Sequence, residues 1–152
     1  MKTSKLTIQK RIREGYPGTI HYGDIIINGI SLYERIAQEF DFVSCLGWGD
    51  RDFQKKQIRR LLLRDVSDFP NHRNSIYICP VCADLGCGAV TTEIEITNGM
   101  VKWSRFGLQD NLKDTVQYFE KIEAFHFNLD EYKEAIINSK GIGSFKWPWD
   151  KE

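Results

Sequence analysis

Residues 91–103 carry the pattern that most constrains the fold, a run of alternating side chains broken by a two-residue turn. Asn98-Gly99 is a favoured turn between two antiparallel strands, and residues 100–103 then run back. Because successive side chains of a strand point to opposite faces, the alternation predicts an antiparallel sheet with one buried face. The alternating residues are Thr91, Glu93 and Glu95 on one side and Thr92, Ile94 and Ile96 on the other.

Other segments predict further strands and about three helices. β-branched and aromatic runs indicate strands at 19–28, 42–46, 75–78 and 122–127. The predicted helices and their capping residues are 32–40 with Ser31 and Glu34, 53–65 with Asp50 or Asp52, and 129–139 with Asn128 or Asp130.

Residues 1–14 indicate a basic helix or arm that ends before Pro17-Gly18. No internal repeat or linker divides the chain, so we expect residues 1–152 to form one domain. The predicted class is α+β, an antiparallel β-sheet with about three helices packed on it.

Composition points to a soluble cytoplasmic protein. Hydrophobic residues make up 41% and charged residues 28% of the 152 residues, which is ordinary for a soluble domain. No apolar stretch approaches the roughly 20 residues of a membrane span. Residues 1–10 lack the apolar core of a secretory signal, and four unevenly spaced cysteines do not resemble a disulfide scaffold. We therefore expect reduced thiols and no membrane contact.

Three of the four cysteines, Cys79, Cys82 and Cys87, gather in one glycine-rich turn between two predicted strands. Two cysteines three residues apart direct their sulfurs into one space, as in zinc sites and redox pairs. A structural zinc ion needs four ligands. The candidates for the fourth ligand are Cys45, His72 and His126.

Two further interpretations of this turn stay open. Cys79 and Cys82 could exchange as a redox pair, although such pairs usually open a helix. Alternatively, the cysteines are small buried hydrophobic residues in a tight corner. The expected cofactor is thus either none or a structural zinc. We assign no catalytic residue, because the sequence has no nucleophile–base motif and no phosphate-binding loop.

Charge is segregated along a chain whose net charge is zero. Residues 1–14 carry five basic residues against one acidic, a net of +4, and residues 51–73 carry seven against three, again +4. Residues 107–134 carry three basic residues against seven acidic, a net of −4. Such segments either attract each other within the fold or form faces for a charged partner. The side chains that we expect at a partner interface are Lys55, Lys56, Arg59, Arg60, Asp110, Asp114 and Glu120.

Residues 141–152 form an aromatic tail that includes Trp147 and Trp149. Aromatic side chains at a chain end either fold back to close the core or anchor an interface, where tryptophan is enriched. The sequence leaves both alternatives open.

The segments 78–89, which includes the cysteine turn, and 101–107 together resemble a widespread family of short bacterial proteins of uncharacterised function. Segments 23–29 and 44–49 also look like that family, so the resemblance covers most of the chain. Some members are automatically labelled oxidoreductases. The resemblance implies one bacterial cytosolic domain and transfers no catalytic residue.

Three functions are compatible with these patterns. The first is a non-enzymatic protein-binding domain, of the kind that neutralises a cognate toxin or nuclease as an immunity protein. The second is a zinc- or thiol-dependent oxidoreductase centred on Cys79, Cys82 and Cys87. The third is a nucleic-acid binder that uses the basic helix 53–65, which the neutral net charge disfavours.

Overall fold

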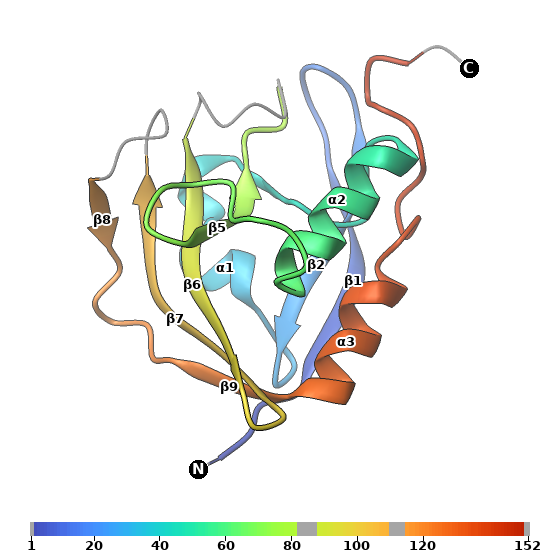
Figure 1. Ribbon diagram of the computed structural model, residues 1–152. Helices are drawn as coiled ribbons and strands as arrows, with labels where there is room; N and C mark the ends of the chain where they lie inside the picture. The colour runs from blue at the N-terminus through green and yellow to red at the C-terminus, as the bar shows by residue number, and fades with distance from the viewer. Residues whose placement is uncertain (1, 82–87, 110–114, 151–152) are drawn as a thin grey trace.

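The computed structural model describes residues 2–81, 88–109 and 115–150, and within them it has two antiparallel sheets and three α-helices (Figure 1). The first sheet has the order β1-β2-β3, with β1 at Leu6–Arg13, β2 at Ile20–Ile27 and β3 at Ile30–Ser31. The second has the order β4-β5-β6-β7-β8, with β4 at Val43–Ser44, β5 at Arg73–Ile78, β6 at Ala89–Thr97, β7 at Met100–Gln109 and β8 at Val116–Tyr118. β9 at Phe125–Asn128 also pairs with β7. The helices are α1 at Leu32–Ile36, α2 at Arg51–Leu61 and α3 at Leu129–Asn138, with a short 3-10 helix at Gln38–Phe40. The predicted α+β class is confirmed.

The hairpin turn at Asn98-Gly99 forms as the sequence predicts. Thr97 pairs with Met100 across Asn98 and Gly99, which have φ angles of 51° and 75°. Two successive positive φ angles match the turn type whose twist fits an antiparallel hairpin. The β6-β7 hairpin is therefore set by local backbone preferences.

The predicted helix caps are also present, and the structure decides between the alternatives. The side chain of Ser31 accepts a hydrogen bond from the Glu34 amide, and Asp50 accepts one from the Phe53 amide at 2.9 Å. Asn128 caps α3 in the same way. Each cap satisfies an amide that the first helical turn leaves without a partner.

The prediction of a helix or arm at residues 1–14 is wrong, because residues 6–13 form strand β1. Apolar side chains recur at every second residue at Leu6, Ile8 and Ile12, with Lys10 as the exception. β1 pairs with β2 along its whole length, from Leu6 opposite Ile27 to Arg13 opposite Ile20. The many basic residues obscured that period in the sequence.

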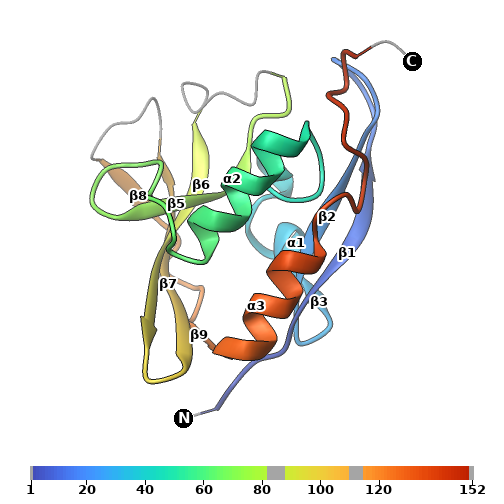
Figure 2. The same ribbon diagram turned by 45° about the vertical axis from the view of Figure 1, so that its right-hand side comes forward.

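Helices α2 and α3 lie side by side over the space between the β1-β2 hairpin and the second sheet (Figures 1 and 2). Tyr132 of α3 joins three of these elements. Its hydroxyl donates to the Leu61 carbonyl at 2.6 Å and accepts from the Trp103 indole N–H at 3.1 Å. All three residues are buried in the core. A buried hydroxyl with both partners fixes the helices to the sheet at one point.

Three glycines close the fold where the C-terminal segment passes over β2, and we call Gly23, Gly47 and Gly143 the glycine crossing. The Gly23 amide donates to the Leu46 carbonyl, and the Gly143 amide donates to the Gly47 carbonyl, both at 2.8 Å. A Cβ atom on Gly143 would lie 1.7 Å from the His21 carbonyl oxygen. Three backbones meet here more closely than any side chain allows, so glycine is required.

We expect Gly143→Ala to lower the free energy of unfolding by about 3 kcal/mol or more, because backbone must move to admit the methyl group. Gly99→Ala is the matched control, since its Cβ would meet nothing within 4 Å and only its φ of +75° is strained. The control substitution should lower the free energy of unfolding by about 1 kcal/mol. Urea unfolding of both variants gives the comparison, and equal losses would contradict the close approach.

Candidate interaction surface

The cysteines that can be placed do not form a shared site. Cys82 and Cys87 lie outside the described residues. Cys45 is buried and its amide donates to the Ile76 carbonyl, whereas Cys79 follows the end of β5 and is partly exposed. Because Ile76 lies three residues before Cys79, the strand separates the two cysteines by about 10 Å. The expectation that Cys45 completes a site with Cys79 is therefore not supported by the geometry.

Burial raises the pKa of the Cys45 thiol to about 11, although the nearby Arg60 guanidinium acts in the opposite direction. A zinc ligand or an attacking thiol must be deprotonated. Cys45 stays protonated near neutral pH, and its thiol lies 3.6 Å from the Ser75 carbonyl oxygen. These contacts make it a structural residue.

The two histidines proposed as alternative zinc ligands are on different parts of the fold. His72 is exposed in the loop before β5, and His126 lies on β9 opposite Lys102. Within the ranges that the structure covers, no three ligating side chains gather into a group that could hold a metal ion. The proposed Cys79–Cys82–Cys87 zinc site itself is not tested, because it includes residues outside those ranges.

We expect Cys45 to be alkylated by iodoacetamide at pH 8 about a hundredfold more slowly than Cys79, since burial raises the pKa of the Cys45 thiol, which leaves little thiolate, and also blocks access to it. Mass spectrometry of the labelled peptides measures the two rates. In urea the rates should converge. A fast reaction of Cys45 in the folded protein would contradict its structural role.

Of the four basic residues that we expected on the exposed face of α2, three are there. Lys55, Lys56 and Arg59 are exposed, but the prediction for Arg60 is wrong, because only 1% of it is accessible. Arg60 donates to Asn74 Oδ1 at 2.9 Å and forms an ion pair with Asp68 at 3.4 Å.

The difference between Arg59 and Arg60 comes from helix geometry. Adjacent residues are about 100° apart around a helix, so one of two neighbouring arginines can face solvent while the other faces β5. No local signal in the sequence distinguishes them. One acceptor of Arg60, Gln57 Oε1, lies one helical turn before it, and the others lie 8 to 15 residues further along the chain.

The exposed face of α2 keeps positive charge that the fold does not neutralise. Arg59 pairs with the exposed Asp65 at 3.2 Å, whereas Lys55 and Lys56 form no ion pair with any residue that the structure describes. Exposed lysines are strongly hydrated and stabilise the fold little. This charge is therefore available to a partner.

The aromatic tail folds back along the first turn of α2 (Figures 1 and 2). The Trp147 ring lies 4.9 Å from the Phe53 ring and 5.7 Å from the Trp48 ring, measured between centroids. Its indole N–H donates to the Asp50 carboxylate at 3.2 Å. Trp147 therefore folds back onto the core, which is one of the two alternatives for the tail.

Trp149 has a different environment from Trp147. Its ring stacks on the Trp147 ring with 5.2 Å between centroids and 4° between planes, and 48% of the residue is exposed. Nearby, the Arg51 guanidinium lies 3.8 Å above the Phe145 ring. A tryptophan held by one face presents its other face to solvent. We define the aromatic–basic surface as Arg51, Lys55, Lys56, Arg59, Phe145 and Trp149.

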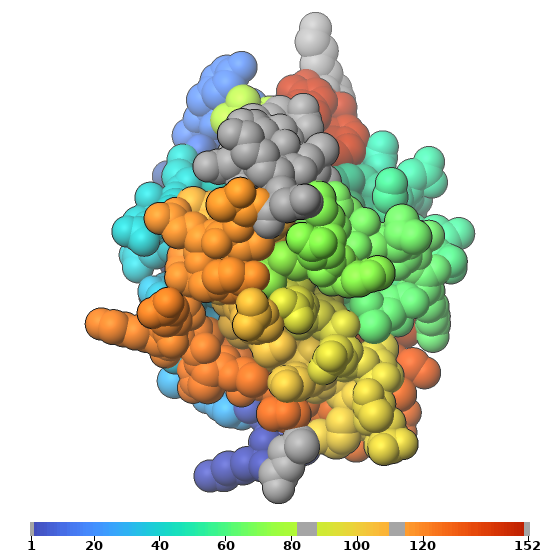
Figure 3. Space-filling model, turned by 60° about the vertical axis from the view of Figure 1, so that its left-hand side comes forward, coloured from blue at the N-terminus to red at the C-terminus, as the bar shows by residue number. Residues whose placement is uncertain are grey.

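The acidic residues expected at an interface are only partly placed. Asp110 and Asp114 lie outside the described ranges, and Glu120 is exposed in the segment after β8. Figure 3 views that side of the molecule, where the segment (orange) lies beside the green chain that leads into β5. Glu120 follows β8, the last strand in the order of the second sheet, and we do not assign it to the aromatic–basic surface.

Besides Arg60, the fold buries two charged residues that no sequence pattern predicts, Asp24 and Arg73. Asp24 on β2 accepts hydrogen bonds from the Ser31 hydroxyl at 2.6 Å and the Tyr77 hydroxyl at 3.1 Å, and it pairs with Arg11 at 3.3 Å. Burial, followed by the Asp24 charge, raises the pKa of Tyr77 well above its usual value, so the phenol remains a donor. No sequence motif marks this cluster, because its members come from four separate elements.

The second buried charge is Arg73 on β5. It donates to the hydroxyl of Thr91 at 3.0 Å and to the backbone carbonyl of Arg105 at 2.5 Å, and it pairs with Glu93 at 3.4 Å. Arg105 has a φ of 56° at an irregularity of β7. These bonds hold the irregular strand in place, which is a structural role.

Comparisons with protein-family models, with curated proteins and with solved structures found no match. The resemblance to a bacterial family therefore stays a prediction. No helix in the described parts of the chain is long and apolar enough to cross a membrane.

The two tail tryptophans should respond differently to truncation. We expect Trp147→Ala to lower the free energy of unfolding by about 2 to 3 kcal/mol, because it loses packing against Trp48 and Phe53. Trp149→Ala should change it by about 0.5 kcal/mol or less, as for other surface positions. Chemical unfolding compares the two, and a larger loss for Trp149 would show that its ring is needed for folding.

Proposed function

We propose that this chain is a non-enzymatic protein-binding domain that recognises an acidic protein partner through the aromatic–basic surface. The observation that carries the proposal is the placement of Trp149, about half exposed and stacked on a tryptophan that the core holds. Tryptophan and arginine dominate binding energies at protein interfaces. A side chain that is already ordered loses little conformational entropy when it binds.

The exposed positive charges of α2 favour an acidic partner. Lys55 lies about one helical turn after Arg51, whose guanidinium lies over the Phe145 ring of the tail, and Lys56 is exposed on the adjoining side of the helix. Complementary charge speeds encounter and selects the partner. A protein is favoured over nucleic acid because this face offers only a few cations, while tight DNA binding commonly uses contacts to six or more phosphates.

The particular function that we propose is that of an immunity protein, which neutralises a cognate toxin or nuclease in a bacterial cytoplasm. Small size, segregated charge and an anchored aromatic tail support it. The alternative, a zinc- or thiol-dependent oxidoreductase at Cys79, Cys82 and Cys87, stays a prediction. Elemental analysis and thiol titration with and without a chelator would test it.

The test of the binding function uses the full chain as bait in extracts of its source cell, beside two double variants of equal charge. Lys55→Glu with Lys56→Glu changes the proposed surface, and Lys2→Glu with Lys121→Glu changes exposed lysines elsewhere. We expect an acidic protein to be captured by the natural chain and the control. Its affinity for the surface variant, measured by calorimetry on the purified pair, should fall at least about tenfold.

Trp149→Ala should weaken the same complex by a similar factor without changing stability. Capture that nuclease treatment abolishes would replace the protein partner with nucleic acid. Equal affinity for the natural chain and both double variants would reject the aromatic–basic surface.

A further inference from the structure

Strand β1 is at the edge of its sheet. It pairs with β2 on one side, and no strand in the described residues pairs with its other side. Figure 2 shows β1 at one margin of the molecule, with α3 on its inner side and the C-terminal segment (red) over the upper part of the β1-β2 hairpin. An edge of eight residues presents backbone donors and acceptors to solvent.

The hydrogen bonds at the start of β1 show which backbone groups face outward. The Asn28 amide donates to the Lys5 carbonyl, so Lys5 points towards β2. The Ser4 amide instead donates to the His126 carbonyl, on the outer side. Because the direction alternates along an antiparallel pair, the N–H and C=O groups of Ile8, Lys10 and Ile12 face outward.

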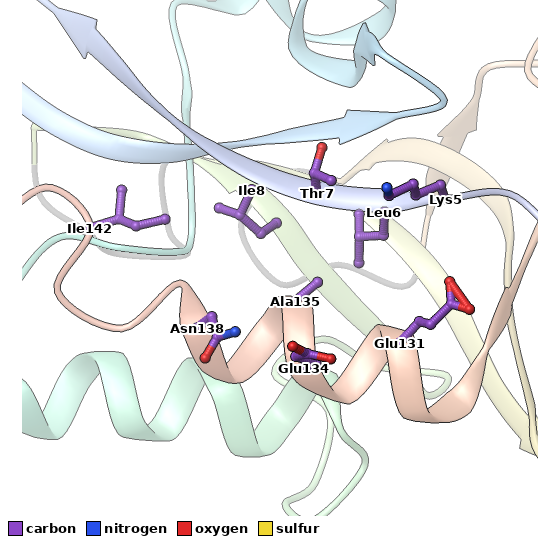
Figure 4. A pocket seen from close by; sticks show the side chains of 9 residues that line it. All are labelled: Lys5, Leu6, Thr7, Ile8, Glu131, Glu134, Ala135, Asn138 and Ile142. Carbon is purple, nitrogen blue, oxygen red and sulfur yellow. The ribbon is translucent and has the colours of Figure 1, made fainter.

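A groove runs beside this edge, between β1 and α3 (Figure 4). Its volume is about 480 Å³. Figure 4 shows Ile8 and Leu6 pointing from β1 towards Ala135 on α3, with Ile142 at one end. These four side chains give the groove an apolar floor.

The charges at the groove are not all neutralised within the fold. Glu131 and Glu134 stand on the α3 wall, are exposed and form no ion pair with any side chain in the described ranges. Lys5 lies on the β1 side. The groove therefore has a net negative charge above an apolar floor, which fits apolar side chains with a basic residue among them.

We propose that the outer edge of β1 binds an extended segment of another protein as an added β-strand. The segment forms backbone hydrogen bonds with Ile8, Lys10 and Ile12. Its alternate side chains enter the groove, where they are apolar except for a lysine or arginine opposite Glu134. Main-chain bonds give affinity in this mode, and the pockets for alternate side chains give specificity.

A second copy of this chain is a poorer occupant. β1 carries Lys10, Arg11 and Arg13 and no acidic residue. Edge-to-edge pairing of two copies would place these charges beside each other, and like charges on neighbouring strands are destabilising. Lys10 thus acts against self-association while leaving its own N–H group free.

This site is separate from the aromatic–basic surface, so the inference goes beyond the proposed function. The two share no residue. The edge site is tested with peptides, and the outcome does not depend on whether the aromatic–basic surface binds a protein.

The probe is a phage-displayed library of random dodecapeptides, selected on the full chain. We expect enriched peptides in which apolar residues alternate and one groove-facing position is lysine or arginine. Lys10→Pro removes one outward N–H group but no bond to β2, and proline is tolerated at such an edge position. Peptide affinity should fall at least about tenfold in Lys10→Pro and less than about threefold in Lys10→Ala, which keeps the N–H group.

Hydrogen exchange with the tightest peptide gives a second readout. The amides of Ile8, Lys10 and Ile12 should become at least about tenfold more protected, whereas Thr7, Gln9 and Arg11 already donate towards β2 and should change little. Lys55→Glu with Lys56→Glu should bind the peptide normally. No enrichment, peptides insensitive to Lys10→Pro, or protection of both sets of amides alike would overturn the proposal, as would a stable dimer that excludes the peptide.

Discussion

The glycine crossing is the constraint on which the arrangement of this protein depends. At Gly143 the chain passes so close to the His21 carbonyl that no side chain fits, and it is bonded there to Gly47. The residue before the crossing, Ile142, closes one end of the groove beside β1. The residues after it carry Trp147 onto Phe53 of α2. One close backbone contact therefore positions the tail part of the aromatic–basic surface and one end of the groove beside β1.

The sequence correctly predicts those parts of the fold that depend on residues close together along the chain. Ser31, Asp50 and Asn128 cap helices because a side-chain oxygen reaches an amide three residues ahead. Asn98 and Gly99 form a hairpin turn because both tolerate positive φ. These choices need no information from elsewhere in the chain, and they suffice to predict an antiparallel α+β fold.

The parts that could not be predicted depend on partners distant in the sequence. Arg60 and Arg59 are neighbours, yet only Arg60 meets Asp68 and Asn74 beneath the helix. The basic residues of segment 1–14 favour a helix or arm over a strand, and the partial burial of charge at Arg11 is explained only by Asp24 on β2, which pairs with it. For the same reason, the sequence identifies segments rich in positive residues, but it does not predict which of these residues form ion pairs in the fold and which remain exposed without one. Four members of the aromatic–basic surface, Lys55, Lys56, Arg59 and Trp149, are among the residues that the sequence predicts at an interface, whereas the edge of β1 is not.

The buried polar groups explain why recognition is assigned to the surface. Asp24, Arg60 and Arg73 each bond to several partners, so their burial is offset within the fold. By contrast, Lys55, Lys56 and the outward amides of β1 have no hydrogen-bond or ion-pair partner among the described residues. Such exposed polar groups can bind another molecule without the loss of a hydrogen bond or ion pair within the fold. A change at the glycine crossing would disturb both surfaces through Ile142 and Trp147, so only substitutions at the surfaces themselves can separate the two binding roles.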